Sequence, residues 1–411
     1  MLGALVGSHA QHALVSDMSV EGNSRLRSSF VLRASDQKVG QPLDSLHLHA
    51  DIIRLKRMPA VSHAYYRVET KANGQYRVVY TIEKNSTLIP QLNIYTTNDD
   101  EFAYRVGLYE FNTLGQNIAF GGFFQKDIYD SYGINFRAPF LVNSHIGLAV
   151  NFQDLTTQEP VFLEEGVADY KYNNTSFEIL GLYSFNLRHR VEVGLTLFNE
   201  DYTYLEGATN PTIPQDFNID KILYKGIYIY NNLDYFYQYV DGFQNTFNFQ
   251  YVISSEATLP DFLIGWNDIQ YYKRVGEKGN WASRLRLGLA SNKDSPFAPF
   301  SVDNNLNIRG VGNIIDRGTG AVVLNTEYRY TLYEKNWFGL QVNGFIDAGT
   351  WRNPGGDFGD FGDDQNLRVY PGVGLRFIHK RIFNAIFRID YGYGITPDAT
   401  SGFVFGIGQY F

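Results

Sequence analysis

The run Ala385-Ile386-Phe387-Arg388-Ile389-Asp390-Tyr391-Gly392-Tyr393-Gly394-Ile395 alternates between large apolar side chains and polar or small ones. Successive side chains of a β-strand point to opposite faces, so this run predicts a strand with one apolar face and one polar face. The segment 324–332 follows the same rule, with these residues on its polar face: Asn325, Glu327, Arg329 and Thr331. A third example is 284–289, where leucines alternate with Arg284, Arg286 and Gly288.

The composition indicates which face meets which solvent. The chain of 411 residues has 30 Tyr and 31 Phe, yet only 19% of it is charged and its mean hydropathy is -0.25. A membrane-spanning helix needs about 20 consecutive apolar residues, and the sequence has no such run. A transmembrane β-barrel combines many aromatic residues with modest hydropathy, because each strand turns apolar residues to lipid and polar ones to the lumen. A soluble β-sandwich also alternates, and aromatic content separates the two only in part.

After Pro90 the sequence consists of many short alternating segments separated by turn residues. This pattern predicts about sixteen antiparallel strands, an even number as bacterial barrels require. The expected strands are 88–96, 102–112, 117–126, 132–139, 145–154, 176–187, 189–203, 220–233, 243–255, 262–274, 281–291, 321–332, 338–348, 367–379, 384–395 and 403–411. The longest connections then lie on the outer side, at 155–175, 204–219, 292–320 and 349–366.

The N-terminal part has a different character. Residues 1–10 resemble the end of a signal peptide, although the basic start of such a segment is absent; the alternative is an ordinary flexible terminus. Residues 12–86 carry 11 Lys+Arg against 7 Asp+Glu, whereas residues 87–411 carry 24 against 36. This shift predicts a small domain over 11–86 and a barrel over 87–411. Neither part has the concentrated basic stripe of a nucleic-acid-binding protein.

The small domain is expected to have the order β-α-α-β-β. A strand over 14–20 is followed by a turn in which Asn23 or Ser24 caps a helix from Arg25 to about Ala34. Asp44 caps a second helix that ends before Pro59. Two strands, 63–71 and 75–84, are joined by a hairpin signal at Asn73-Gly74. A generic α+β domain would have the same order.

This order resembles a polypeptide-transport-associated (POTRA) domain, and so do the residues at 20–23, 79–83 and Gly40. Further along, the sixth outer loop contains Asn307-Ile308-Arg309-Gly310-Val311, and two strands carry Asn325-Thr326-Glu327 and 345–349 (Phe-Ile-Asp-Ala-Gly). Together these motifs resemble the BamA/TamA superfamily of outer-membrane barrels over nearly the whole chain.

The resemblance implies that the sixth loop folds into the lumen and that Arg309 pairs with Glu327 and Asp347 on the barrel wall. Alternation independently places both carboxylates on the polar face of their strands. The superfamily usually has an aromatic residue after Arg-Gly, so Val311 predicts weaker or different packing of the loop. The alternative is an Arg-Gly turn in an ordinary external loop.

The first and last strands of the barrel are expected to pair weakly where they meet, and this junction is called the seam. Pro90 lacks an N–H in the first strand, and Gly406 and Gly408 weaken the last one. Alternatively, Pro90 simply begins its strand. The last strand is expected to place Phe403, Phe405, Ile407 and Phe411 on one face. This pattern resembles the C-terminal signal by which the assembly machinery recognises barrel substrates.

Together these features predict an outer-membrane barrel, with its N-terminal domain in the periplasm, that assists insertion or translocation of polypeptides. The expected partners are outer-membrane lipid and lipopolysaccharide, unfolded polypeptide clients, and periplasmic or lipoprotein accessory proteins. No catalytic motif, cofactor or metal site is expected, and the acidic loop 355–364 has no EF-hand spacing. The alternative function is a passive pore or structural membrane protein.

Overall fold

The computed structural model describes residues 14–22, 25–96, 102–163, 165–211, 213–256, 259–295, 298–302, 307–311, 316–397 and 399–411. The expected signal-peptide remnant at 1–10 lies outside these residues. Within them, no helix is both long and apolar enough to cross a membrane.

The small domain has the expected order of elements: β1 (Val15–Glu21), α1 (Ser28–Ala34), α2 (Ser45–Lys56), β2 (Val61–Thr70) and β3 (Tyr76–Lys84). Its sheet has the order β1-β3-β2, with β1 parallel and β2 antiparallel to β3. The helices bury Phe30, Val31, Leu48 and Leu55 against this sheet. Asp44 caps α2 as predicted, since its side chain accepts from the N–H groups of Leu46 and His47.

The start of the first helix was predicted wrongly. α1 begins at Ser28 instead of Arg25, and its N-cap residue Arg27 makes no side-chain capping bond. The Arg27 N–H instead donates to the carbonyl of Gly115, at 2.9 Å, in a turn of the barrel. The barrel therefore supplies an acceptor where the sequence suggested a local cap. Asn23 and Ser24 lie outside the described residues.

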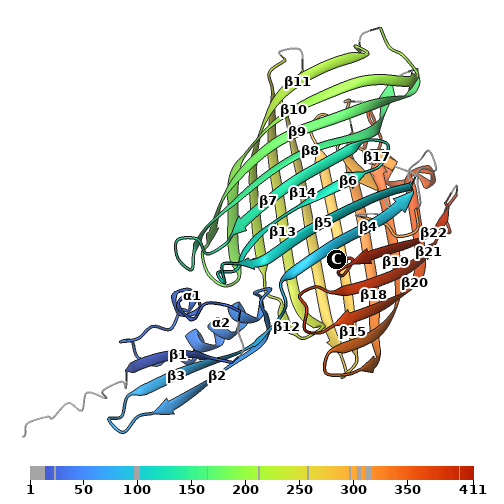
Figure 1. Cartoon of the computed structure of the whole chain (residues 1–411). Helices are drawn as coiled ribbons and strands as arrows, with labels where there is room; N and C mark the ends of the chain where they lie inside the picture. The colour runs from blue at the N-terminus through green and yellow to red at the C-terminus, as the bar shows by residue number, and fades with distance from the viewer. Residues whose placement is uncertain are drawn as a thin grey trace, which may run out of the picture.

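The remainder is a closed antiparallel barrel in which β22 lies beside β4 (Figure 1). Its sixteen long strands confirm the predicted count: β4 (Leu88–Thr96), β5 (Phe102–Thr113), β6 (Ile118–Lys126), β7 (Asp130–Ala138), β8 (Ile146–Leu163), β9 (Gly166–Ser184), β10 (His189–Gly207), β11 (Asp216–Asn231), β13 (Tyr239–Ser254), β14 (Phe262–Val275), β15 (Gly279–Ala290), β18 (Gly320–Glu334), β19 (Phe338–Arg352), β20 (Leu367–His379), β21 (Ile386–Tyr393) and β22 (Ser401–Ile407). Three short strands add to them: β12 (Asp234–Phe236), β16 (Phe300–Val302) and β17 (Asp316–Gly318). Two 3-10 helices, η1 (Phe358–Gly362) and η2 (Asp364–Asn366), lie between β19 and β20.

The alternation sorts side chains as predicted. In β21, Asp390 is fully buried and Arg388 is 9% exposed, whereas Phe387 and Tyr393 are exposed on the outer face. In β18, Leu324, Tyr330 and Leu332 are exposed outside, and the polar face is buried: Asn325, Glu327, Arg329 and Thr331. The apolar exterior and polar interior of a transmembrane barrel are therefore both present.

Most of the predicted outer loop 155–175, and the two ends of the predicted loop 204–219, are instead strands. β8 and β9 remain paired as far as Leu163 and Gly166, and β10 and β11 as far as Thr203 and Asp216, so this side of the barrel is tall. The extension is stabilised by an aromatic cluster around Tyr170 and Tyr202, which packs with Leu163, Tyr172, Tyr204 and Phe217. Pro160 and the many polar residues in this part of the sequence obscured the strand pattern.

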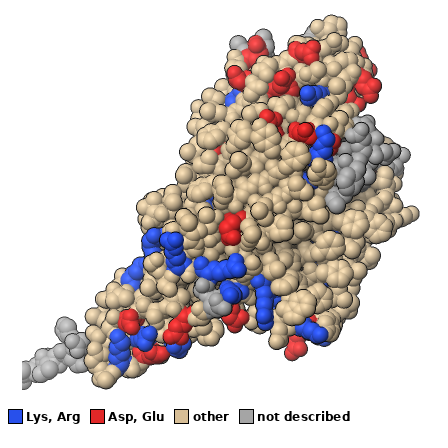
Figure 2. Space-filling model, viewed as in Figure 1, with Lys and Arg blue, Asp and Glu red and all other residues tan. Residues whose placement is uncertain are grey.

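The barrel has two unlike rims. The near rim, which meets the small domain, has short turns such as 114–117 and 185–188, and the far rim carries the connections 291–319 and 353–366. Figure 2 shows Asp and Glu gathered toward the far rim and Lys and Arg where the small domain meets the barrel. Phe140, in a near-rim turn, packs against the core of the small domain, with its ring 6.3 Å from that of Phe30.

Candidate functional site

The segment 307–311 of the loop between β15 and β18 is buried inside the barrel. Arg309 Nε and Nη2 donate to the two carboxylate oxygens of Asp347 at 2.8 and 2.9 Å, and its main-chain N–H donates to Asp347 Oδ2 at 3.0 Å. Its Nη1 donates to Glu327 Oε2 at 2.5 Å. The structure therefore brings together the loop arginine and both of the wall carboxylates that were expected to pair with it.

A second ring of charges surrounds this group. Asp390 Oδ1 lies 3.6 Å from Arg309 Nη1 and accepts from Arg376 Nη1 at 2.7 Å. Arg388 Nη1 donates to Asp390 Oδ2 at 3.3 Å, and Arg329 pairs with Glu327. Asp390 and these three arginines were not predicted to be site residues. The polar face of the run 385–395 contains the signal that would have found Asp390 and Arg388.

The centre of this ion-pair cluster is shielded from solvent. The cluster consists of Arg309, Arg329, Arg376, Arg388, Glu327, Asp347 and Asp390. The side chains of Arg309, Glu327 and Asp347 have no exposed surface. Desolvating charges is costly, and removing one partner of a buried pair typically costs about 3–5 kcal/mol. The arrangement is therefore favourable only while every partner is in place.

Aromatic rings enclose the guanidinium of Arg309. Its central carbon lies 3.7 Å from the ring centre of Phe345 and 4.5 Å from that of Tyr410. A cation over an aromatic face is stabilised by the ring quadrupole, most strongly where water is excluded. The rings thus fill the space that hydrogen bonds leave around the arginine and keep water from it.

Gly310 allows the loop to touch the wall backbone to backbone. Its φ is +95°, and a Cβ there would lie 2.7 Å from the Cα and carbonyl oxygen of Gly392 in β21. A Cβ on Gly392 would in turn lie 2.2 Å from the carbonyl oxygen of Arg309. Any side chain at either position would push the segment off the wall, which is a physical reason for glycine after the arginine.

Ile308 and Val311 fix the loop on an apolar bed. Both are fully buried in a cluster with Val302, Ala321, Val323, Trp351 and Tyr370. The Oγ1 of Thr400 also donates to the carbonyl oxygen of Val311 at 2.5 Å. Val311, where an aromatic residue was expected, is thus completely enclosed by its neighbours.

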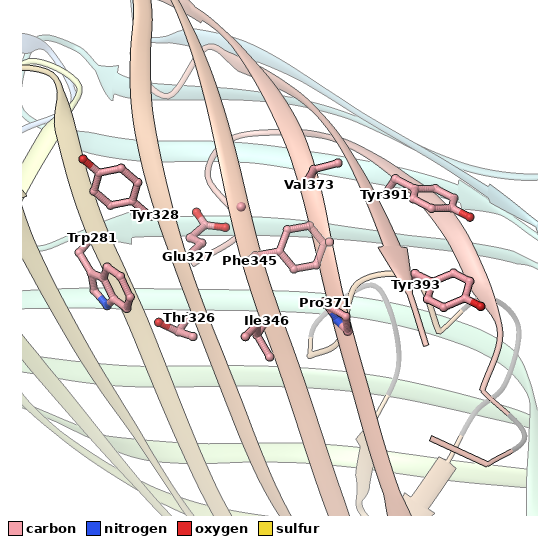
Figure 3. Close-up of a pocket in the computed structure, with 12 residues that line it drawn as sticks. Trp281, Thr326, Glu327, Tyr328, Phe345, Ile346, Pro371, Val373, Tyr391 and Tyr393 are labelled. Atoms are coloured by element: carbon pink, nitrogen blue, oxygen red, sulfur yellow. The ribbon is translucent and has the colours of Figure 1, made fainter. Parts of the chain in front are cut away.

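The wall behind the cluster is only one layer thick. A mainly apolar groove of about 550 Å³ lies on its outer face, between residues such as Trp281, Tyr328, Ile346 and Val373 (Figure 3). Glu327 and Phe345, which contact Arg309, also line it. The same four strands, β18 to β21, therefore present aromatic and aliphatic groups outward and the ion-pair cluster inward.

The C-terminal residues depart from the prediction. Phe403, Phe405 and Ile407 are exposed on one outer face, but β22 ends at Ile407 and Phe411 does not continue that face. Phe411 instead packs near Leu233, Tyr272 and Ala282, with its ring 5.6 Å from the guanidinium carbon of Arg284. The chain turns inward at Gly408, whose φ of +96° favours glycine.

The placement of Pro90 bears on the seam. It is the third residue of β4 and pairs with Leu108, so the alternative that it merely begins the strand is wrong. Three positions before Pro90, Thr87 is linked to Phe111 by a hydrogen bond from Phe111 N–H to Thr87 O at 3.0 Å. Bonded and non-bonded pairs alternate along antiparallel ladders. This spacing gives residue 89 its bonds to β5 and points residue 90 toward β22, so the missing donor of Pro90 faces the seam.

The two seam glycines have different roles. A Cβ on Gly406 would lie 2.7 Å from Nη2 of Arg388, so this glycine makes room for a member of the ion-pair cluster. Gly408 provides the inward turn. At the near rim, Ser86 just before β4 exchanges hydrogen bonds of 2.9 Å with the main chain of Arg381 and Phe383, in the turn between β20 and β21.

The acidic loop 355–364 uses its carboxylates locally. Asp357 accepts from the N–H of Gly359, Asp363 from that of Gln365, and Asp360 from that of Asn353. The bonds of Asp357 and Asp363 cap η1 and η2, respectively. No group of three or more potential metal ligands occurs among the residues that the structure describes.

Comparisons with known proteins place this architecture among solved barrels. No family model matches the sequence, and no curated protein matches it. The structure is similar to that of BamA from Haemophilus ducreyi lacking POTRA domains 1-3, with a TM-score of 0.55 and 15% identity over 97% of this chain and 84% of that chain. It is also similar to CdiB from Acinetobacter baumannii, with a TM-score of 0.63 and 14% identity over 97% and 74%. For CdiB from Escherichia coli the values are 0.55 and 10%, over 99% and 92%. The predicted likeness to BamA-type barrels is therefore confirmed at the level of the fold.

Proposed function

We propose that the chain is an outer-membrane barrel that assists insertion of outer-membrane proteins or translocation of polypeptides, with its small domain in the periplasm. Its likeness to BamA and CdiB barrels supports this location and role. The apolar exterior and the far-rim loops suit contact with outer-membrane lipid and lipopolysaccharide. No catalytic step is part of the proposal.

The observation that carries the proposal is the loop 307–311, held inside the barrel by the buried pairs of Arg309 with Asp347 and Glu327. A passive pore gains nothing from an arginine that binds a loop to the inner face of its wall. A barrel that must stay closed until a client arrives does, because the loop can be released as one unit.

The small domain offers a place for clients. β1 and β2 are the two edges of its sheet, and the β2 edge presents Tyr65, Tyr66 and Val68 as exposed side chains. An extended peptide can add to such an edge by main-chain hydrogen bonding. We expect unfolded polypeptides, and periplasmic or lipoprotein accessory partners, to bind there.

The seam between β4 and β22 is the proposed exit toward the membrane. Its strands have 9 and 7 residues, against 18 and 19 for β8 and β9. Cysteine pairs introduced between positions 88–92 and 403–407 should form disulfides where the Cα atoms are about 4.4–6.8 Å apart. We expect oxidation to abolish activity and reduction to restore it. Full activity of a fully cross-linked barrel would exclude lateral opening.

Two measurements test the overall function. Depletion of the protein should lower the abundance of particular outer-membrane or exported proteins, measured by quantitative proteomics of the membrane. In planar bilayers the wild type should conduct little, and Arg309→Ala should conduct strongly because the loop is freed. Equal, steady conductance of both proteins, together with an unchanged membrane proteome, would favour the passive pore.

A further inference from the structure

A cavity of about 380 Å³ lies where the small domain meets the near rim. Its walls come from residues 54–59 of the small domain and from the barrel strands β5, β6, β7, β9, β10, β11, β12 and β13. So many neighbouring strands of one ring can surround a cavity only on its concave side. The cavity is therefore the entrance to the lumen next to the small domain, and it shares no lining residue with the ion-pair cluster.

The lining is strongly cationic. Two histidines, His145 and His189, line the cavity, and no Asp or Glu is among its lining residues. Five arginines also line it: Arg54, Arg57, Arg137, Arg188 and Arg190. Charges of one sign on the wall of a recess reinforce one another and raise the local concentration of oppositely charged groups. The chain as a whole has a net charge of -8, so this lining is not a consequence of general composition.

Part of this charge is already neutralised. Arg54 pairs with Asp36 and Asp51, at 2.8 and 2.9 Å. Arg137 and Arg190 share one carboxylate, that of Glu192, which has 3% of its side chain exposed. Two guanidinium groups on one carboxylate leave one positive charge without a counterpart.

Arg57 and Arg188 add two further positive charges. Arg57 donates to main-chain carbonyls of the near rim, to Leu187 at 2.7 Å and to Leu233 at 2.8 Å, which positions it without neutralising it. Burial lowers the pKa of Arg57; nearby Tyr235 and Asp234 oppose this, and the charge of Arg188 lowers the pKa further. Among the described residues, no carboxylate lies within ion-pair distance of Arg188, which is exposed. Five arginines less the three carboxylates that pair with them leave about two positive charges available to a ligand.

The position of the cavity favours a polypeptide over a lipid. Its wall is the inner face of the barrel, whereas lipid contacts the outer face. It also adjoins the start of β2, because Met58 and Pro59 line it and β2 begins at Val61. A chain held on the β2 edge would therefore lead directly into it.

We propose that this cavity binds carboxylate-bearing segments of an unfolded polypeptide as they enter the barrel. This inference rests on the proposed client-handling function and adds the chemical class of the client segment. Asp and Glu side chains would accept hydrogen bonds from the arginines, which donate in a planar fork suited to carboxylates.

The test uses the full chain in detergent micelles, so that both rims are accessible, and three fluorescent peptides of equal length. One is rich in Glu, the second has Gln at the same positions, and the third has Lys. Fluorescence anisotropy should give tightest binding for the Glu peptide. Its Kd should rise steeply with salt, because salt screens exposed charges.

Arg188→Glu is the decisive variant, because Arg188 has no ion-pair partner whose loss would disturb the fold. It should weaken binding of the Glu peptide by about tenfold or more, as expected when a charge in a binding site is reversed. The matched control is Lys278→Glu in the near-rim turn between β14 and β15, which makes the same charge change outside the cavity. The control should leave Kd unchanged within about twofold.

The outcomes separate the two proposals. Equal binding of the Glu and Gln peptides would overturn this inference and leave the client-handling function standing. No binding of any peptide would overturn both. If a soluble short-chain phosphatidylglycerol binds with dependence on Arg188 while the Glu peptide does not, the cavity is a lipid-headgroup site and the inference is wrong.

Discussion

The barrel has two walls that use the same alternation and reach opposite results. In the wall β18–β21, the inward charges of Arg309, Glu327 and Asp347 have no exposed surface. In the wall β8–β11, the inward pairs Lys221–Glu200 and Lys225–Glu178 keep between 11% and 18% of each side chain exposed. The first wall is covered by the loop 307–311 and by Tyr410, whereas the two ion pairs of the second remain partly exposed. The difference shows that a covering segment makes an inward face dry, and alternation alone does not.

The largest effect should come from Arg309→Ala. Removing the arginine leaves Glu327 and Asp347 buried with fewer partners. This should lower the free energy of unfolding, or that of binding the loop to the wall, by about 3–5 kcal/mol. We expect a lower midpoint of urea unfolding in micelles and rapid protease cleavage within the loop. An unfolding midpoint equal to that of the wild type, with a protected loop, would mean that the two walls do not differ in this way.

Gly310→Ala should act on the same wall without removing a charge. The added methyl group would meet Gly392 at 2.7 Å, in a backbone conformation that alanine rarely adopts. A cost of about 1–3 kcal/mol is expected for such strain. Protease accessibility of the loop should increase while circular dichroism of the strands stays the same. Gly344→Ala is the matched control, since nothing lies within 4 Å of a Cβ at that outward position.

Tyr410→Leu should have an intermediate effect by removing the aromatic cover. The ring lies 4.5 Å from the guanidinium carbon of Arg309 and 4.9 Å from that of Arg388. Losing these contacts should cost about 0.5–2 kcal/mol, measured as a shift in the unfolding midpoint. Tyr410→Phe keeps the ring and should retain most of the stability. If both variants are equally destabilised, the ring is not what protects the cluster.

The smallest effect is expected in the opposite wall, from Lys225→Met. Glu178 would lose its lysine but keep hydrogen bonds from Asn151 at 2.7 Å and Thr196 at 3.1 Å, and it remains partly exposed. Pairs of this kind contribute about 0–1 kcal/mol. A loss as large as that of Arg309→Ala, in the same urea titration, would remove the distinction between the walls.

Much of the barrel was predictable because alternation is a local property. The strand 386–393 could be recognised from its own residues, and Asp347 and Glu327 could be placed on inward faces in the same way. The cover of that face by the loop 307–311 was expected only from the family resemblance, and the cover by Tyr410 was not predicted, because contacts between segments distant in sequence are not a local property. The outward placement of Phe411 failed for a related reason, because a single positive φ at Gly408 redirects the chain.

The extended strands of the wall β8–β11 show that alternation can also miss strands that are present. Residues 155–175 contain Pro160 and many polar side chains, so they were assigned to a loop although they pair as β8 and β9. Their stability comes from cross-strand contacts such as that of Tyr172 with Tyr202 of β10, with ring centres 4.7 Å apart. Such contacts between strands are not visible from either strand alone.

The apolar bed of the loop contains a natural optical reporter. Trp351 is 6% exposed and touches the same cluster as Ile308 and Val311, whereas Trp281 and Trp337 are about half exposed and Trp266 is intermediate. If the loop departs, water reaches the indole of Trp351, and its fluorescence emission should move to longer wavelength. The forms of the barrel with the loop bound and with the loop released can therefore be distinguished in real time, without any attached dye, by the emission wavelength of Trp351.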